Sequence, residues 1–109
     1  PMKEIELDVD TAVPVGLIIN ELLTNSLKYA FPKGKLGKIS ISLEEIGQGM
    51  LQLCIADNGI GKALHAKAQG TGFGTQLVDL LTRQIEGTLQ QEVNNGTRIS
   101  VKFKKVKAA

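Results

Sequence analysis

Hydrophobic positions follow two different spacings in the first third of the chain. Ile5, Leu7 and Val9 alternate with acidic residues, which predicts a strand with one solvated face. From Val15 the apolar residues recur at helical spacing, and Pro32 is expected to end this helix. Pro14 would fall in its first turn, the expected N-cap is Asp10 or Thr11, and the expected buried side comprises Val15, Ile18, Ile19, Leu22, Ser26, Leu27 and Ala30.

The rest of the chain predicts two hairpins separated by a loop and a second helix. Residues 58–74 are glycine-rich and typical of a loop, and the second helix is expected to run from Gly74 or Thr75 to Gly87. Asn94-Asn95-Gly96 is a favoured hairpin turn. Four further strands are expected at residues 38–45, 50–56, 88–93 and 97–106. The second helix is expected to bury Leu77, Val78, Leu80, Leu81 and Ile85.

This order of elements predicts an α+β two-layer sandwich. We expect a mixed, mostly antiparallel sheet of about five strands with the helices on one face. The chain has 109 residues, of which 42% are hydrophobic and 22% charged, so residues 1–109 are expected to form one domain. The net charge of +2 gives no argument for a nucleic-acid partner. The single cysteine, Cys54, excludes an internal disulfide and is expected to be a buried, unreactive thiol.

A line of polar residues on the first helix could carry chemistry. Glu21, Asn25 and Lys28 would fall within a stripe of roughly 60°, nearly opposite the apolar side. An amide oxygen can bind Mg²⁺, an ammonium can meet phosphate, and a carboxylate can orient or deprotonate a nucleophile. An ordinary solvated face would also show charged residues at this spacing. Asn25 favours a site, because asparagine is a poor residue for a helix interior.

Two glycine-rich segments could form other walls of the same site. Asp57 ends an apolar strand and is followed by Asn58-Gly59-Ile60-Gly61. This is a common turn sequence, but its carboxylate could also accept a hydrogen bond from an exocyclic amine such as that of adenine. Gly70, Gly72 and Gly74 lie at the start of the second helix, whose free N–H groups could bind phosphate. The Gly-Lys-Ser/Thr ending of a P-loop is absent, and no parallel strand-helix-strand unit supports a dinucleotide fingerprint.

Three motifs taken together resemble a known family. NELLTNSLKYAF at residues 20–31, DNGIG at 57–61 and GTGFGTQLV at 70–78 are similar to the ATP-binding catalytic domain of sensor histidine kinases. That domain belongs to the gyrase, Hsp90, histidine kinase and MutL (GHKL) ATPase superfamily, and the resemblance implies its Bergerat ATP-binding fold. The glutamate in the first motif and the short loop after DNGIG most resemble the HWE and HisKA_2 subfamily. No clear F box separates the glycine motifs, so a small lid is expected.

The resemblance also implies a role for each matching residue. Asn25 resembles the magnesium ligand, and Glu21 resembles the general base of the superfamily's ATPases, which in a kinase could instead prepare the phosphoryl acceptor. Asp57 resembles the aspartate that recognises adenine, and Thr97 resembles a threonine that joins it there. The other implied nucleotide contacts are Lys28 with phosphate, Tyr29 in the pocket wall, Gly59 and Gly61 beside Asp57, and Gly72 and Gly74 at the phosphate-side helix.

The implied function is to bind ATP and Mg²⁺ and to donate the γ-phosphoryl group to a histidine on a separate dimerisation domain, in two-component signalling with a response regulator. The only histidine, His65, lies in the predicted loop. We therefore expect a monomeric catalytic fragment of a longer sensor kinase, facing the cytoplasm, that does not phosphorylate itself alone. The parent protein could be soluble or membrane-anchored. Two alternatives remain open: a serine protein kinase of the anti-sigma type, and a non-catalytic nucleotide-dependent switch.

Overall fold

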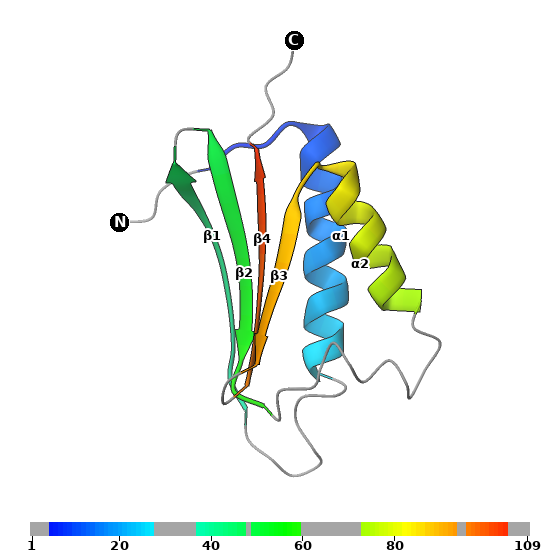
Figure 1. Cartoon of the computed structure of the whole chain (residues 1–109), viewed down its shortest axis with the longest axis vertical. Helices are drawn as coiled ribbons and strands as arrows, with labels where there is room; N and C mark the ends of the chain where they lie inside the picture. The colour runs from blue at the N-terminus through cyan, green and yellow to red at the C-terminus, as the bar shows by residue number, and fades with distance from the viewer. Residues whose placement is uncertain (1–4, 28–36, 48, 60–72, 94–95, 105–109) are drawn as a thin grey trace.

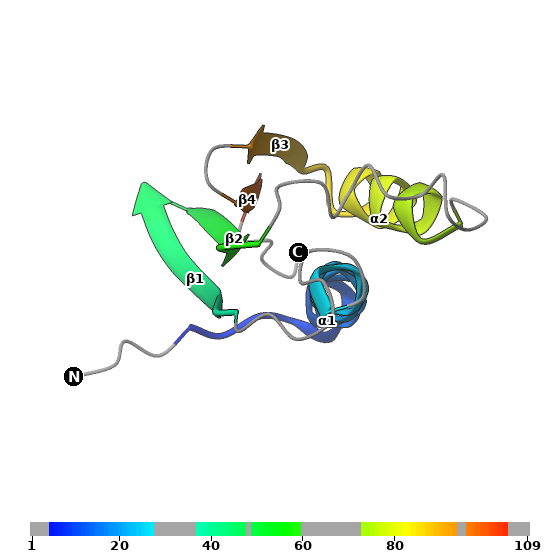
Figure 2. The ribbon, with the colours of Figure 1, turned by 90° about the horizontal axis from the view of Figure 1, so that it is seen from below.

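A computed structural model describes residues 5–27, 37–47, 49–59, 73–93 and 96–104. The elements occur in the order α1 (Val9–Asn25), β1 (Ile39–Gly47), β2 (Met50–Asp57), α2 (Phe73–Gln84), β3 (Thr88–Val93) and β4 (Thr97–Lys104). The strands form one antiparallel sheet in the order β1-β2-β4-β3. Both helices lie on the same side of this sheet (Figures 1 and 2), which confirms the α+β two-layer fold.

The predicted first strand is wrong, so the described sheet has four strands rather than about five. Residues 5–8 carry no strand, and Val9 already begins α1. The helix starts early because its N-cap is Asp8, and not Asp10 or Thr11. The Oδ1 atom of Asp8 accepts a hydrogen bond from the backbone N–H of Thr11 at 3.0 Å. The cap therefore interrupts an alternation that otherwise favours a strand.

The helix also contains Pro14 in its interior rather than in its first turn. Its predicted end at Pro32 lies outside the described residues. None of the described helices is long and apolar enough to cross a membrane.

The hydrophobic core lies between the two helices and the sheet. Side chains alternate along β2 and β4, so every second residue of these central strands points toward the helices. Leu80 of α2 was expected in this core but is 57% exposed, because it is two positions from the buried Val78 and so faces away from it. The core members are Val15, Ile18, Leu22, Leu51, Leu53, Ile55, Val78, Leu81, Ile85, Ile99, Val101 and Phe103.

The chain turns sharply between α2 and β3. Glu86 has a positive φ of 56°, and the N–H of Gly87 donates a hydrogen bond to the carbonyl of Thr82 at 2.8 Å. This is the arrangement that commonly closes a helix. A Cβ atom on Gly87 would lie 3.0 Å from the carbonyl oxygen of Lys102, so glycine suits this close approach to β4. The helix itself ends at Gln84, before the predicted Gly87.

One end of the molecule collects the ends of four elements. Figure 1 shows that α1 and β2 finish at this end, and that α2 and β4 begin there. The β2–β4 register places Asp57 directly opposite Thr97, which joins two of these four ends.

A glycine in this region is required by the fold. Gly96 has a φ of 131°, and a Cβ atom there would collide with the carbonyl oxygen of Asp57. We therefore expect Gly96→Ala to lower the free energy of unfolding by about 2 kcal/mol or more.

The matched control is Gly16→Ala, where the added Cβ meets no atom within 4 Å inside α1. This change should raise the free energy of unfolding by about 0.5–1 kcal/mol. Denaturant titrations of both variants would measure the pair, and equal effects would contradict the described backbone at Gly96.

Candidate functional site

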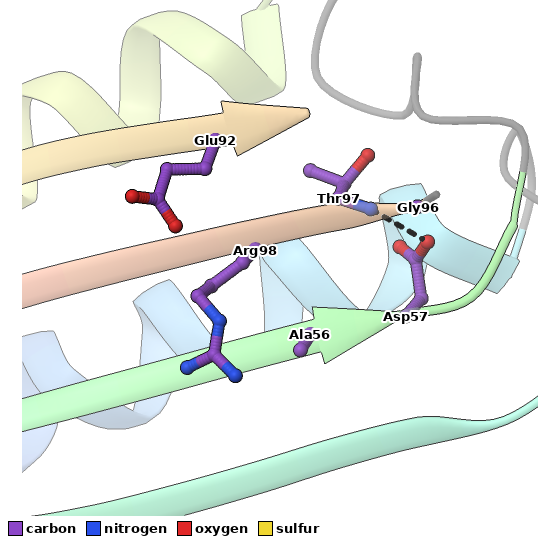
Figure 3. A pocket seen from close by; sticks show the side chains of 6 residues that line it. All are labelled: Ala56, Asp57, Glu92, Gly96, Thr97 and Arg98. Atoms are coloured by element: carbon purple, nitrogen blue, oxygen red, sulfur yellow. Dashed lines mark hydrogen bonds between the residues drawn. The ribbon is translucent and has the colours of Figure 1, made fainter. Parts of the chain in front are cut away.

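The carboxylate of Asp57 joins three separate segments of the chain. Its Oδ2 atom accepts a hydrogen bond from the hydroxyl of Ser26 at 2.9 Å. Its Oδ1 atom accepts one from the N–H of Gly59 at 2.9 Å and one from the N–H of Thr97 at 3.3 Å. Figure 3 shows the contact between Asp57 and Thr97 at the paired ends of β2 and β4. The end of α1, the turn after β2 and the start of β4 are therefore held together by one half-buried side chain.

Ser26 belongs to this site, and it is also on the buried side of α1 as predicted. It is buried, and it follows Asn25 at the point where α1 changes to a π-helical turn over Ser26 and Leu27. Such turns are rare in proteins, and those that do occur are often found at functional sites. The only signal in the sequence was a hydroxyl residue among apolar positions, which a core-facing serine would also give.

Thr97 holds a buried hydroxyl with no hydrogen-bond partner among the described residues. The residue is only 3% exposed, and its Oγ1 atom is fully covered. Leaving such a group unpaired costs about 1–3 kcal/mol, so native proteins seldom keep one without a reason. The unpaired hydroxyl thus belongs to the same residue whose backbone N–H donates to the Asp57 carboxylate.

Glu21 and Asn25, the described members of the polar line on α1, do not lie opposite the core. Glu21 and Asn25 are half-buried. Asn25 comes three residues after the buried Leu22 and is thus only about 60° from it around the helix. The side of α1 that faces away from the core carries Val13 and Leu17 instead. The two polar residues therefore flank the buried side, toward the end where Asp57 lies.

Gly74 is in the first turn of α2, at the same end of the molecule. The structure thus brings Asp57, Gly59 and Thr97 into direct contact, with Asn25 adjacent to Ser26 in the sequence. Four predicted nucleotide contacts and the only histidine lie outside the described residues: Lys28, Tyr29, Gly61, Gly72 and His65.

Two hollows lie beside Asp57 on the sheet face that points away from the helices. Ala56 and Arg98 occupy outward positions of β2 and β4, and the guanidinium of Arg98 donates to Cys54 Sγ at 3.0 Å. Cys54 is buried, as expected. The first hollow, of about 230 Å³ (Figure 3), is lined by Ala56, Asp57, Glu92, Gly96, Thr97 and Arg98. The second is lined by Lys38, Ile39, Ser40, Ala56, Asp57 and Asn58. No described residue of α1 lines either hollow.

Comparison with known proteins gives a family and several structural relatives. The sequence profile of the family described as "Histidine kinase-, DNA gyrase B-, and HSP90-like ATPase" matches residues 10–107. The histidine kinase domain of a blue-light activated histidine kinase from Erythrobacter litoralis aligns with 23% identity and a TM-score of 0.81, over 94% of this chain and 48% of that one. A second structure of that kinase gives 22% identity and a TM-score of 0.84, over 94% and 33%. No curated protein sequence gives a significant match.

The mycobacterial sensor histidine kinase MprB aligns with 22% identity and a TM-score of 0.68, over 85% of this chain and 71% of that one. At these identities the likeness to solved structures shows the shared fold. The chain spans half or less of the two Erythrobacter structures that it matches.

The free hydroxyl of Thr97 predicts an unusual response to mutation. Thr97→Val replaces an unpaired buried hydroxyl by a methyl group, so the free energy of unfolding should stay within about 0.5 kcal/mol of the original value or rise. The control is Thr82→Val, because the equally buried Thr82 hydroxyl donates to the Val78 carbonyl at 2.7 Å. That variant should lose about 1 kcal/mol. A larger loss at Thr97 than at Thr82, measured by denaturant unfolding, would show that the Thr97 hydroxyl has a stabilising partner.

Proposed function

The chain belongs to the histidine kinase-, DNA gyrase B- and HSP90-like ATPase family, and we propose that it binds ATP with Mg²⁺ and donates the γ-phosphoryl group to a histidine on a separate domain. The observation that carries this proposal is that the Asp57 carboxylate accepts a hydrogen bond from the backbone N–H of Thr97, a residue whose buried hydroxyl has no hydrogen-bond partner among the described residues.

Asp57 and Thr97 together suit the hydrogen-bonding edge of adenine. A carboxylate has about four acceptor positions, and three hydrogen bonds to Asp57 are described, so a position remains for the exocyclic amine. The Thr97 hydroxyl can donate to a ring nitrogen beside that amine. Guanine would present a carbonyl oxygen to the carboxylate, which offers no donor. We therefore propose that this pair selects adenine.

We propose that Asn25 contributes an amide oxygen to Mg²⁺ at the phosphate end. The described residues contain no group of three or more His, Cys, Asp or Glu side chains placed to hold a metal. This fits Mg²⁺ that arrives on a nucleotide, because Mg²⁺ keeps several waters and is commonly held by substrate phosphates and few protein oxygens. The bound ion would neutralise phosphate charge.

The start of α2 would meet the phosphates, since helix N-termini attract anions and Gly74 lies in its first turn. The remaining proposed contacts are Lys28 with phosphate, Tyr29 in the wall, Gly59 and Gly61 beside Asp57, and Gly72 next to α2.

The transfer step needs an acceptor from outside the described residues. A ring nitrogen of the acceptor histidine would attack the γ-phosphorus, and the bond to the β–γ bridging oxygen would break, with its electron pair leaving on ADP. The carboxylate of Glu21, one helical turn before Asn25, would orient the imidazole or take its proton. We propose that the acceptor domain passes the phosphoryl group to a response regulator, and that this chain is a catalytic fragment of a longer sensor kinase.

Calorimetric titration with ATP and ADP tests the nucleotide site. Asp57→Asn should weaken binding at least about tenfold, because one acceptor oxygen becomes a donor amide facing the adenine amine. Thr97→Val should also weaken binding without loss of stability. The control is Asn58→Ala in the same turn, since the Asn58 side-chain oxygen accepts a hydrogen bond from the backbone N–H of Lys38 at 2.8 Å and not from the Asp57 cluster. Unchanged affinity in Asp57→Asn would contradict the adenine assignment.

The same titration distinguishes contacts to Mg²⁺ from contacts to adenine. Asn25→Ala should weaken Mg²⁺-ATP much more than metal-free ATP, and an equal loss in both would refute a metal role for Asn25.

Phosphate chemistry tests the acceptor. The isolated chain with radiolabelled ATP should form no phosphohistidine. Addition of a dimerisation domain from its parent protein should give acid-labile, base-stable phosphate on that domain. Acid-stable phosphoserine on an added protein would favour the serine kinase alternative. Nucleotide binding with no transfer to the added domain would favour the switch.

A further inference from the structure

The first half of the side of α1 that faces away from the core is apolar, and the exposed Asn20 follows it one turn after Gly16. Val9, Val13 and Leu17 are 73%, 56% and 45% exposed, and the small residues Ala12 and Gly16 are exposed beside them. We call these five residues the outer α1 face. In Figure 2, which views α1 end-on, the sheet and α2 lie on two sides of this helix. We propose that the outer α1 face is a docking surface for an amphipathic α-helix with basic flanking residues.

Neither the core nor the nucleotide site accounts for this face. The core uses Val15, Ile18 and Leu22, and the proposed site uses the flank with Glu21 and Asn25. Single exposed apolar residues are common on soluble proteins, but a contiguous row usually marks an interaction site. A solvated helix face is normally polar.

The shape of the face suits another helix. Val9, Val13 and Leu17 are spaced four apart and form a ridge along α1. Ala12 and Gly16 form a parallel row, and the space above Gly16 is open, since an added Cβ would meet no atom within 4 Å. A ridge beside a row of small residues is the relief into which the side chains of a second helix pack, at axial distances of about 8–10 Å. The ridge is about 12 Å long, which matches two to three turns of a partner.

The charged residues in and before α1 indicate which charge a partner helix should carry. Every charged residue between Ile5 and Leu27 is acidic, namely Glu6, Asp8, Asp10 and Glu21. A second copy of α1 would place acidic residues opposite acidic residues in either orientation, and an anionic membrane would be repelled as well. A helix with Lys or Arg beside its apolar stripe would complement both the ridge and the acidic flank.

This inference goes beyond the proposed function and does not depend on it, because docking at this face requires no nucleotide. The test uses isotope-labelled chain without nucleotide and two synthetic helical peptides. Both peptides carry the same leucine and alanine stripe, and they differ only in having lysine or glutamate at the flanking positions.

The lysine peptide should shift the amide signals of Val9, Val13 and Leu17 and bind at least fivefold more tightly than the glutamate peptide. Leu17→Asp should weaken the lysine peptide at least tenfold. Leu80→Asp should not, although Leu80 on α2 is at least as exposed as Leu17. Asp10→Lys should reduce the preference for the lysine peptide, and dispersed spectra would show that each variant is folded.

The proposal is overturned if the two peptides bind equally, or if neither binds at millimolar concentration. It is also overturned if Leu80→Asp weakens binding as much as Leu17→Asp does. Self-association of the chain through Val13 and Leu17, seen by sedimentation, would assign the face to a second copy instead. Calorimetry with ATP on the Leu17→Asp variant keeps the two proposals separate, since its nucleotide affinity should be unchanged.

Discussion

The hydrogen bonds to the Asp57 carboxylate are the contacts on which the site depends. They hold together the last turn of α1, the turn after β2 and the first residue of β4. This arrangement requires the β2–β4 register that puts Asp57 opposite Thr97, since a slip of one residue would turn the carboxylate to the bare face of the sheet. It also requires glycine at position 96, where the chain passes against the Asp57 carbonyl. The fold and the binding chemistry thus share one side chain.

Helix α1 serves three purposes on three of its sides. One side supplies Val15, Ile18 and Leu22 to the core, and the adjacent flank positions Glu21 and Asn25 near the end where Asp57 lies. The third side is the apolar outer α1 face. Apolar side chains therefore occupy two sides of α1, and helical spacing alone could not show which of them faces the core. A half-buried position also limits the freedom of Asn25 and Glu21, which suits the positioning roles proposed for them in phosphoryl transfer.

Local patterns predicted the parts of the fold that depend on neighbouring residues. The two hairpins and both helices follow from alternation, turn residues and helical spacing, and the structure has them within a few residues at each described end. The prediction of the first strand was wrong because the hydrogen bond from the Thr11 N–H to Asp8 begins a helix inside an alternating segment. The predicted burial of Leu80 was wrong because apolar character alone does not decide which side of a helix a residue occupies.

The site was predicted less completely, for a different physical reason. Asp57 and Gly59 lie in one short turn, so their sequence suggested a site. Ser26 and Thr97 are 31 and 40 residues away from Asp57, and only the packing of α1 and the β2–β4 register bring them together. Thr97 was identified through the family resemblance, and Ser26 was not identified at all. No local pattern distinguishes a core-facing serine from one that donates to a distant carboxylate.

The central claim is that adenine binds at Asp57, and amide NMR of the labelled chain tests it most directly. The N–H groups of Gly59 and Thr97 both donate to Asp57 Oδ1, so they report on any new hydrogen bond to that carboxylate. Titration with ATP or ADP should shift these two signals together and saturate, while GTP at the same concentration should leave them in place. Equal shifts with GTP, or ATP-induced shifts confined to the face that carries Arg98 and Glu92, would contradict the account.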